Sequence, residues 1–196
     1  MRRWFVCLAM GASLALGGCQ YVKTPDPVLS ARDAEFMALS KTASLDAMYE
    51  RYEVANTTGE PEGTIVVETK QRLLFYVLPG GKKAMRYGVA IGREGFGWTG
   101  ETTIQRMAEW PNWIPPAEMV ARWPHVHATD GGPNNPLGAR ALYLYQDGKD
   151  TLYRIHGTVD PTKIGRQVSS GCIRMRNIDV IDLYNRVAVG ARVIVR

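Results

Sequence analysis

A cysteine near the end of the 196-residue sequence has the surroundings of a nucleophile. Cys172 lies in the segment SSGCIRM, residues 169–175, where two serines and a glycine precede it. A catalytic thiol needs a base, donors for the oxyanion formed on the attacked carbonyl, and a group that orients the substrate. We expect Gly171 to allow an unusual backbone angle, so that the amides of Gly171 and Cys172 point at one oxyanion. A small, inert cysteine buried in a glycine turn is the alternative.

The candidate base is His156, which ends the strand-like segment DTLYRIHG, residues 150–157. Gly157 is expected to let the backbone turn sharply there and expose the imidazole. His156 precedes Cys172 by sixteen positions, so only the fold can bring the two side chains together. Pairing with the imidazole is expected to lower the pKa of the thiol and make thiolate available at neutral pH. A structural histidine at a strand end is the alternative.

His125 and His127 are the other two histidines and form the pattern HVH. On a strand they would face the same way and could chelate zinc. Such a site needs a third and usually a fourth ligand, and the remaining histidine is better used beside Cys172. We therefore expect no metal and no cofactor, with a zinc peptidase as the alternative.

Strand-like patterns dominate the sequence after residue 63 and would carry the reactive side chains. Strands are expected at residues 64–69, 72–78, 84–92, 101–110, 138–146, 150–157 and 191–196. A short helix is expected at 115–123, and a second from its N-cap Asn177 until Gly190, where Asp179 and Asp182 are helix-start and surface acids. This composition predicts a mainly β fold, a β-sandwich or open barrel with one or two short helices. The tryptophans at 98, 110, 113 and 123 would line a cleft or pack in the core.

The N-terminal third is expected to lie apart from the strand-rich body. Residues 20–29 contain two prolines and indicate a tether, while residues 30–53 have helical propensity with Ser30 as a plausible N-cap. Residues 56–63 interrupt that pattern. The expected organisation is a signal peptide at 1–18, a tether and helical arm at 19–62, and a catalytic domain at 63–196.

The first residues indicate export from the cytoplasm. Arg2 and Arg3 precede an apolar stretch, residues 4–16, that is too short to span a bilayer as a mature helix. Leu16-Gly17-Gly18-Cys19 then resembles a bacterial lipobox, where cleavage before Cys19 is followed by its lipidation. An ordinary secretory signal is the alternative. Since Gln20 and not aspartate follows, the outer membrane is the expected destination in a host with two membranes.

Export changes the thiol and charge balance of the mature chain. Cys7 would leave with the signal and Cys19 would be lipidated, so Cys172 would be the sole free thiol in an oxidising compartment. Loss of residues 1–18 reduces the formal charge from +5 to +3. That excess is too small to indicate a nucleic-acid partner.

The segment HGT…IG…SSGCIRM, from His156 to Met175, resembles the signature of YkuD-type L,D-transpeptidases of the ErfK/YbiS kind. The resemblance extends upstream through GGPNNPLGARALYLY, EWPNWIPP and GTIVVET, and covers about residues 48–196. It implies a YkuD-like β fold and a peptidoglycan substrate. One departure is Ser170, which stands immediately before the glycine where many members carry histidine.

The resemblance also implies a role for each site residue. Cys172 would attack the carbonyl between the D-centre of meso-diaminopimelate and the terminal D-Ala of a tetrapeptide stem, with His156 as general base. Gly171 and Ser170 would belong to the oxyanion turn, and Arg174 would hold a substrate carboxylate, with a surface ion pair as its alternative. Gly157 and Ser169 are further candidate substrate contacts, although serines in such turns more often bond to the backbone.

The expected protein is a lipid-anchored L,D-transpeptidase on the periplasmic face of a bacterial envelope. Its partners would be peptidoglycan peptide stems, the membrane through the lipid, and an envelope protein if a protein amine accepts the acyl group. Diaminopimelate, a protein amine and water remain open as acceptors. A non-catalytic wall-binding lipoprotein is the remaining alternative.

Overall fold

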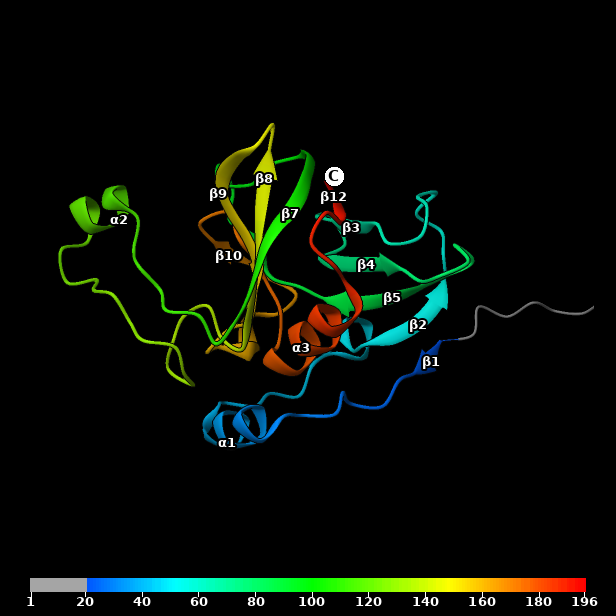
Figure 1. Cartoon of the computed structure of the whole chain (residues 1–196), viewed down its shortest axis with the longest axis horizontal. Coiled ribbons are helices and arrows are strands. Elements are labelled where there is room, and N and C mark those ends of the chain that lie inside the picture. The colour runs from blue at the N-terminus through cyan, green and yellow to red at the C-terminus, as the bar shows by residue number, and fades with distance from the viewer. Residues whose placement is uncertain (1–20) are drawn as a thin grey trace, which may run out of the picture.

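The computed structural model describes residues 21–196, and its main element is a ten-stranded sheet (Figure 1). The strands are β1 (Val22–Lys23), β2 (Tyr52–Ala55), β3 (Ile65–Glu68), β4 (Leu73–Val77), β5 (Lys83–Gly88), β6 (Ile91–Gly92), β7 (Gly100–Glu109), β8 (Arg140–Gln146), β9 (Lys149–His156), β10 (Gln167–Ser169), β11 (Ile173–Arg174) and β12 (Arg192–Val195). The helices are α1 (Ala31–Leu39), α2 (Ala117–Arg122) and α3 (Asn177–Arg186), with single 3₁₀ turns η1 (Ala47–Tyr49) and η2 (Pro161–Lys163). The expected signal peptide and the lipidation site at Cys19 lie outside the described residues.

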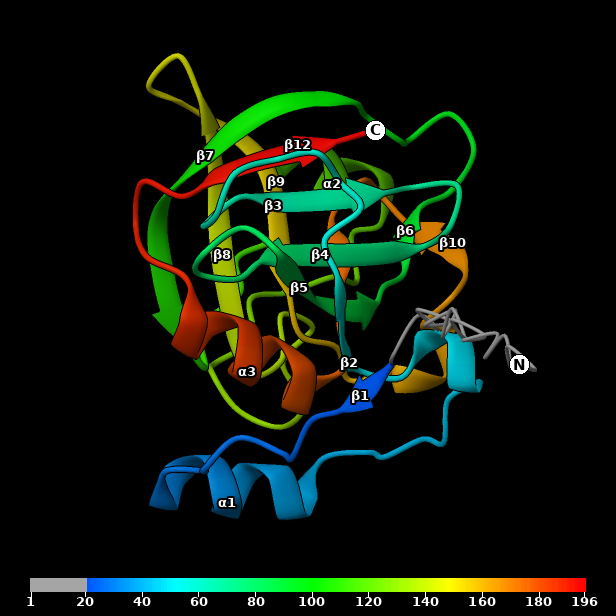
Figure 2. The same ribbon diagram turned by 90° about the vertical axis from the view of Figure 1, so that its right-hand side faces the viewer.

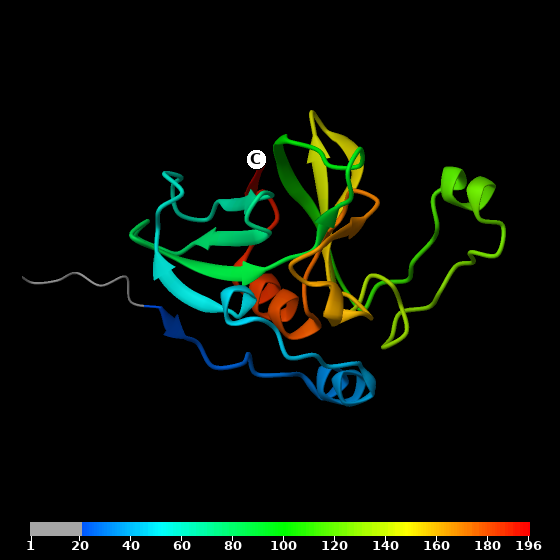
Figure 3. The same cartoon turned by 180° about the vertical axis from the view of Figure 1, so that it is seen from behind.

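The main sheet runs in the order β1-β2-β5-β4-β3-β12-β7-β8-β9-β11, while β6 and β10 form a small second sheet. The C-terminal strand β12 joins the two halves, because it pairs in parallel with β3 and antiparallel with β7. Figures 1 and 3 show these halves at a steep angle to each other, with α3 beneath the bend. The mainly β architecture is confirmed.

The core fills the space between the two halves of the sheet and α3. Along β9 and β11, Ile155 and Ile173 point into it and are 0% and 2% exposed. From α3, Val180, Ile181 and Leu183 are fully buried, as the apolar face of an amphipathic helix requires. Each buried aliphatic side chain contributes roughly 1.5–3 kcal/mol. The strands that carry His156 and Cys172 are therefore anchored through their inward-facing neighbours.

The expected helix over residues 30–53 is wrong beyond Leu39. Ser30 is its N-cap, with Oγ accepting a hydrogen bond from the Asp33 amide (3.1 Å). At the other end the Ser40 hydroxyl bonds to the Phe36 carbonyl (2.8 Å), a local bond that competes with helix continuation. Residues 52–55 then pair with β5, and β1, inside the expected tether, pairs with β2. Tertiary strand pairing thus overrides helical propensity.

The other expected strands and the helix at 115–123 are confirmed, except that the strand expected at 84–92 is divided into β5, in the main sheet, and β6, in the small sheet. The helix expected to run until Gly190 ends at Arg186, and its start also differs. Asn177 is not its N-cap, because Arg176 holds that position without a side-chain hydrogen bond. Asn177 Oδ1 instead accepts from the amides of Ala139 (3.0 Å) and Thr158 (3.2 Å). In residues 21–196 no helix has the length and apolar character needed to cross a membrane.

Candidate active site

The parallel pairing of β9 with β11 brings the reactive side chains to one face. The register aligns Ile155 with Ile173 and His156 with Arg174. Side chains alternate along a strand and paired residues share a face, so Cys172 and Arg174 lie on the face of His156, opposite the two buried isoleucines. The fold therefore sets Cys172 and His156 on one face of the β9–β11 pair although sixteen positions separate them in the sequence.

The imidazole of His156 is buried and tautomerically defined. Its side chain is 5% exposed, so the expectation of an exposed ring is wrong. Nδ1 lies 2.6 Å from the Gly157 carbonyl, and since a carbonyl only accepts hydrogen bonds, Nδ1 carries the proton. Burial first, and the positive charge of Arg174 second, lower the pKa of His156 to about 3, against the opposing carbonyls of Gly157 and Leu137. The ring is therefore neutral at neutral pH, as a general base must be.

Burial keeps the Cys172 thiol protonated, contrary to expectation. Its environment raises the pKa of the thiol, because burial outweighs the Arg154 amide and the charges of Arg154 and Arg174. The thiol donates a weak hydrogen bond to the Leu152 carbonyl, with Sγ and O 3.8 Å apart. The resting pair is thus a neutral thiol and a neutral imidazole, so the proton must leave sulfur during the attack.

The Leu152 carbonyl reaches the thiol because β9 is irregular, a feature not anticipated from the sequence. The register between β8 and β9 shifts between Tyr143 and Tyr145. Leu152 has a positive φ of 62° and its side chain is 64% exposed, while its amide bonds to Asp150 Oδ1 (2.8 Å). A positive φ is unfavourable for leucine, and this side chain faces solvent. We infer that the backbone conformation at Leu152 is kept because it directs the Leu152 carbonyl toward the Cys172 thiol.

Hydrogen bonds within the cysteine turn, residues 169–172, change the expected oxyanion donors. Ser169 is 1% exposed, donates from Oγ to the Cys172 carbonyl (2.6 Å) and accepts from the Gly171 amide (3.2 Å). The Gly171 amide is therefore occupied, and Ser169 holds the turn and does not face a substrate. The amide of Cys172 makes no hydrogen bond within residues 21–196 and is the available donor. Ser170 is exposed beside it.

Gly157 and Gly171 are both required, for different reasons. Gly171 has a φ of 119°, as expected, and a Cβ there would lie 2.5 Å from Cε1 of Tyr153. At Gly157 the need is space, not an unusual angle, because a Cβ would lie 2.2 Å from Asn177 Oδ1. Gly157 is buried and its amide donates to the Arg140 carbonyl (3.0 Å), so it positions His156 and does not touch a substrate.

Trp98 and Tyr153 pack against the outer side of the cysteine turn and form an aromatic clamp on it. Their rings stack with centroids 4.8 Å apart and planes 15° apart. Trp98 Nε1 donates to the Gly171 carbonyl (3.2 Å), and the Tyr153 ring fills the space above the Cα of Gly171. Of the tryptophans at 98, 110, 113 and 123, Trp98 is thus at the candidate site and Trp110 is in the core at 2% exposed. Trp113 packs against a small second cluster of buried residues, and Trp123 lies at the exposed end of α2. Single-sequence reasoning had no signal for Tyr153.

Arg174 is a cation without a counter-ion in residues 21–196. Its half-buried side chain makes no ion pair there, and its buried Nε has no hydrogen-bond partner. Burial lowers the pKa of its guanidinium, which still leaves it charged. The neighbouring Arg154 is instead paired with Asp150 at 2.6 Å. Arg174 is therefore the group suited to an incoming carboxylate.

A cavity of about 510 Å³ lies beside the cysteine turn. Gly171, Trp98 and Ile173 form its wall on the side of the turn, while Arg93 and Gln167 come from the β6–β10 region. Cys172, His156 and Arg174 are not among its lining residues, so the cavity adjoins the cysteine turn without containing the reactive side chains.

The strand required for chelation by HVH does not form. His125 lies in a turn after α2 and His127 in irregular structure, and both are exposed. Within residues 21–196 no group of three or more His, Cys, Asp or Glu side chains converges as metal ligands would. Figures 1 and 3 show α2 on a long loop that projects from the body.

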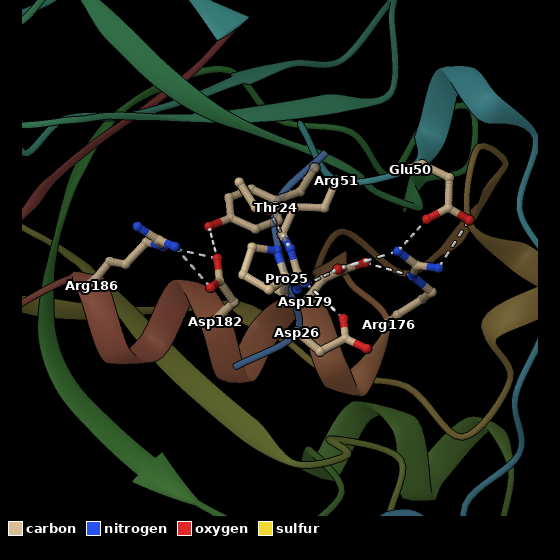
Figure 4. A network of polar contacts seen from close by, with 10 residues as sticks. Thr24, Pro25, Asp26, Glu50, Arg51, Arg176, Asp179, Asp182 and Arg186 are labelled. Carbon is tan, nitrogen blue, oxygen red and sulfur yellow. Dashed lines mark hydrogen bonds and ion pairs between the residues drawn. The ribbon is translucent and has the colours of Figure 1, made fainter. Parts of the chain in front are cut away.

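Asp179 and Asp182 are buried, so the expectation of surface acids is wrong. Asp179, 0% exposed, accepts from Arg51 (3.2 Å) and Arg176 (2.6 Å), and Arg176 also pairs with Glu50 at 2.9 Å (Figure 4).

Arg51 carries this network into the N-terminal segment. It bonds to Thr24 Oγ1 (3.1 Å), the Pro25 carbonyl (3.0 Å) and Asp26 (2.7 Å), as Figure 4 shows. The network fixes the start of α3, whose Asn177 supports the backbone around His156 from behind.

A family model and the curated relatives assign the chain to the same family, the L,D-transpeptidases. Residues 62–195 match the YkuD family model, described as the L,D-transpeptidase catalytic domain. The chain is 36% identical over 138 residues to "Probable L,D-transpeptidase YbiS" of Escherichia coli K12, covering 66% of this chain and 43% of that protein. It is 43% identical over 94 residues to "Putative L,D-transpeptidase in ATP synthase subunits region ORF 5" of Fuscovulum blasticum, 48% of each chain. The chain thus spans less than half the length of these curated relatives.

Two solved structures are similar in fold. L,D-transpeptidase 3 from Mycobacterium tuberculosis, in complex with a faropenem-derived adduct, has a TM-score of 0.52 at 17% identity, covering 76% of this chain and 68% of that chain. A protein from Brucella melitensis named "Probable carnitine operon oxidoreductase caia" is 46% identical, with a TM-score of 0.52, covering 74% of this chain and 92% of that one. Its name states a different activity from the family model and the curated relatives.

Proposed function

The chain belongs to the YkuD family of L,D-transpeptidase catalytic domains, and from this premise we propose that it is a cysteine acyltransferase acting on peptidoglycan peptide stems. The proposed catalytic domain is residues 63–196. Cys172 attacks the carbonyl that joins the D-centre of meso-diaminopimelate to the terminal D-Ala of a tetrapeptide stem. The observation that supports this most directly is the β9–β11 register, which sets Cys172 and Arg174 on the face of His156.

The protonation states of the pair suit attack assisted by a general base. Because Nδ1 of His156 is bonded to the Gly157 carbonyl, Nε2 is the nitrogen that takes the thiol proton as sulfur bonds to carbon. The Cys172 amide donates to the oxyanion, and Arg174 holds a carboxylate of the stem. The imidazolium then returns its proton to the leaving nitrogen, D-Ala departs, and a thioester remains on Cys172.

An acceptor resolves the thioester in the second half of the reaction. Its amine attacks the thioester carbonyl, His156 takes a proton from that amine, and the thiol of Cys172 is restored. We propose an amine as the acceptor, either from a second diaminopimelate, which gives a 3→3 cross-link, or from an envelope protein. Hydrolysis by water would make the protein an L,D-carboxypeptidase or a hydrolase of wall–protein links.

Mass spectrometry of enzyme and products tests this proposal. The chain from Gln20 onward, incubated with tetrapeptide muropeptides or with faropenem, is expected to gain one acyl adduct on Cys172. Cross-linked dimers would support transfer to an amine, and tripeptide alone would support hydrolysis. The matched control is Cys172→Ala, which removes only the sulfur. An unmodified wild-type protein, under conditions that acylate a related L,D-transpeptidase, would reject the proposal.

We also propose that residues 1–18 are cleaved and that Cys19 is lipidated in the envelope. Val22 in β1 follows Cys19 by only three positions, and a chain of that length can span at most about 11 Å. A lipid on Cys19 would therefore hold the sheet edge close to the membrane. Intact-mass analysis of the mature protein and of a Cys19→Ala variant tests this, since only the former should carry acyl chains.

A further inference from the structure

We propose that Asp33, in the N-terminal helix α1, is a positioning residue for His156 and acts through Arg140 and Gly157. Asp33 lies outside the segment that matches the family model, residues 62–195. The inference rests on the proposed role of His156 as general base. It assigns the N-terminal segment a part in catalysis beyond linking the domain to its anchor.

The carboxylate of Asp33 is buried among three donors from the body of the protein and from its own helix. It accepts hydrogen bonds from both terminal nitrogens of Arg140 (2.8 Å each) and from Trp110 Nε1 (2.8 Å). The Ser30 hydroxyl also donates to it (2.9 Å). Burial alone would raise the pKa of Asp33, but these hydrogen bonds and the charge of Arg140 lower it to about 2. Asp33 is therefore ionised under working conditions.

Apolar contacts seat α1 at the same place. The Phe36 ring meets the Trp110 ring edge-on, with centroids 5.0 Å apart. Phe36 also lies against Gly132, near the end of the long loop that leaves β7 at Trp110. Figure 2 shows α1 below the sheet, on the same side as α3. The helix thus docks where β7 ends and β8 begins.

Successive hydrogen bonds, joined through the covalent structure of Arg140 and Gly157, lead from Asp33 to the imidazole. The Arg140 side chain binds Asp33, and its backbone carbonyl accepts from the Gly157 amide (3.0 Å). The Gly157 carbonyl in turn accepts from Nδ1 of His156 (2.6 Å). In the same region β8 and β9 align Ala141 with His156. The first residue of β8 therefore joins the helix contact to the peptide group that sets the tautomer of the base.

Loss of the carboxylate would disturb this chain at Arg140. Arg140 is 2% exposed, its Nε already lacks a partner, and the next carboxylate, Glu109, is 3.9 Å away. A buried guanidinium without its counter-ion is strongly unfavourable and is driven toward water. Such a movement would pull on the start of β8, whose carbonyl holds Gly157. The result would be a less well-defined Nδ1–H tautomer and a misplaced Nε2.

The test compares Asp33→Asn with wild type in the chain from Gln20 onward. One readout is the rate at which faropenem acylates Cys172, per mole of folded protein. The other is the ¹⁵N spectrum of the His156 ring, which reports the tautomer. We expect acylation to slow about tenfold or more, because small misplacements of a base are costly, and the Nδ1–H population to fall. Asp33→Glu, which keeps the charge, should recover part of both.

The matched control is Asp26→Asn, in the same N-terminal segment. Asp26 is exposed, and its partner Arg51 would retain the ion pair with Asp179 after the substitution. The acylation rate and the ring spectrum should therefore stay as in wild type. If Asp33→Asn fails to fold, Phe36→Ala loosens α1 without removing the charge and should shift both readouts the same way. A lower melting temperature with unchanged acylation and tautomer would overturn the inference. Absence of acylation in wild type would instead count against the proposed function, while the ring spectrum would still test the positioning.

Discussion

Arg174 lies directly across the β9–β11 pair from His156, and its guanidinium is the positive charge that helps burial lower the pKa of the imidazole. Arg174 has no carboxylate partner within residues 21–196. A substrate carboxylate bound there would offset that charge. Binding would then raise the pKa of His156 and make it a stronger base when the substrate is in place.

The acidic limit of activity should lie well below the ordinary histidine pKa of 6.5. His156 must be neutral to accept the thiol proton, and its lowered pKa of about 3 keeps it neutral down to acidic pH. Activity is therefore retained as pH falls through 6.5 and is lost only nearer the folded pKa. A pH profile of kcat/KM for faropenem acylation measures this limit. An acidic limb at 6.5 in the free enzyme would contradict the description of His156.

Arg174→Gln should raise KM for a tetrapeptide stem and move the acidic limb upward. Loss of a charge-assisted hydrogen bond to a carboxylate costs about 1.5–3 kcal/mol, which is roughly a tenfold to hundredfold weaker interaction. Loss of the positive charge also raises the pKa of His156. Arg166→Gln is the matched control, because that side chain is exposed and makes no ion pair in the described part of the chain. Equal KM values and equal pH profiles in the two variants would show that Arg174 does not bind the substrate.

Trp98→Phe should slow acylation a few-fold while the turn keeps its stacking partner. The substitution removes the Nε1–H donor to the Gly171 carbonyl but retains an aromatic ring over Tyr153. A neutral hydrogen bond contributes about 0.5–1.5 kcal/mol, so the loss is modest. Trp123→Phe, at the exposed end of α2, serves as the control. Identical acylation rates for all three proteins would show that the clamp does not position Cys172.

Asp179→Asn should lower the free energy of unfolding by about 3–5 kcal/mol, because it leaves two arginines facing a buried, uncharged group. Asp179 is 0% exposed between Arg51 and Arg176. Asp26→Asn breaks an exposed pair with the same Arg51 and should cost no more than about 1 kcal/mol. Urea denaturation measures both. Similar midpoints for the two variants would show that the buried network does not hold the N-terminal segment to α3.

The family and the order of most elements could be predicted from the sequence alone, and the proposed reactive residues come from it as well. Cys172, His156 and Arg174 stand in a specific motif, and alternating apolar residues such as Ile155 mark the strand that carries the base. These signals are local, because motif spacing and periodicity are properties of neighbouring residues. The strands β3, β4, β7, β8, β9 and β12 could be located in that way.

The environments of these residues could not be predicted from the sequence, because they depend on contacts made in the fold. The neutral thiol of Cys172 follows from burial, and the use of the Gly171 amide by Ser169 follows from the shape of one turn. The separation between Asp33 and Arg140 is 107 positions, and that between Arg51 and Asp179 is 128. Contacts so distant along the chain leave no local pattern, so the docking of the N-terminal segment behind the base was decided by packing and by the need to pair buried charges.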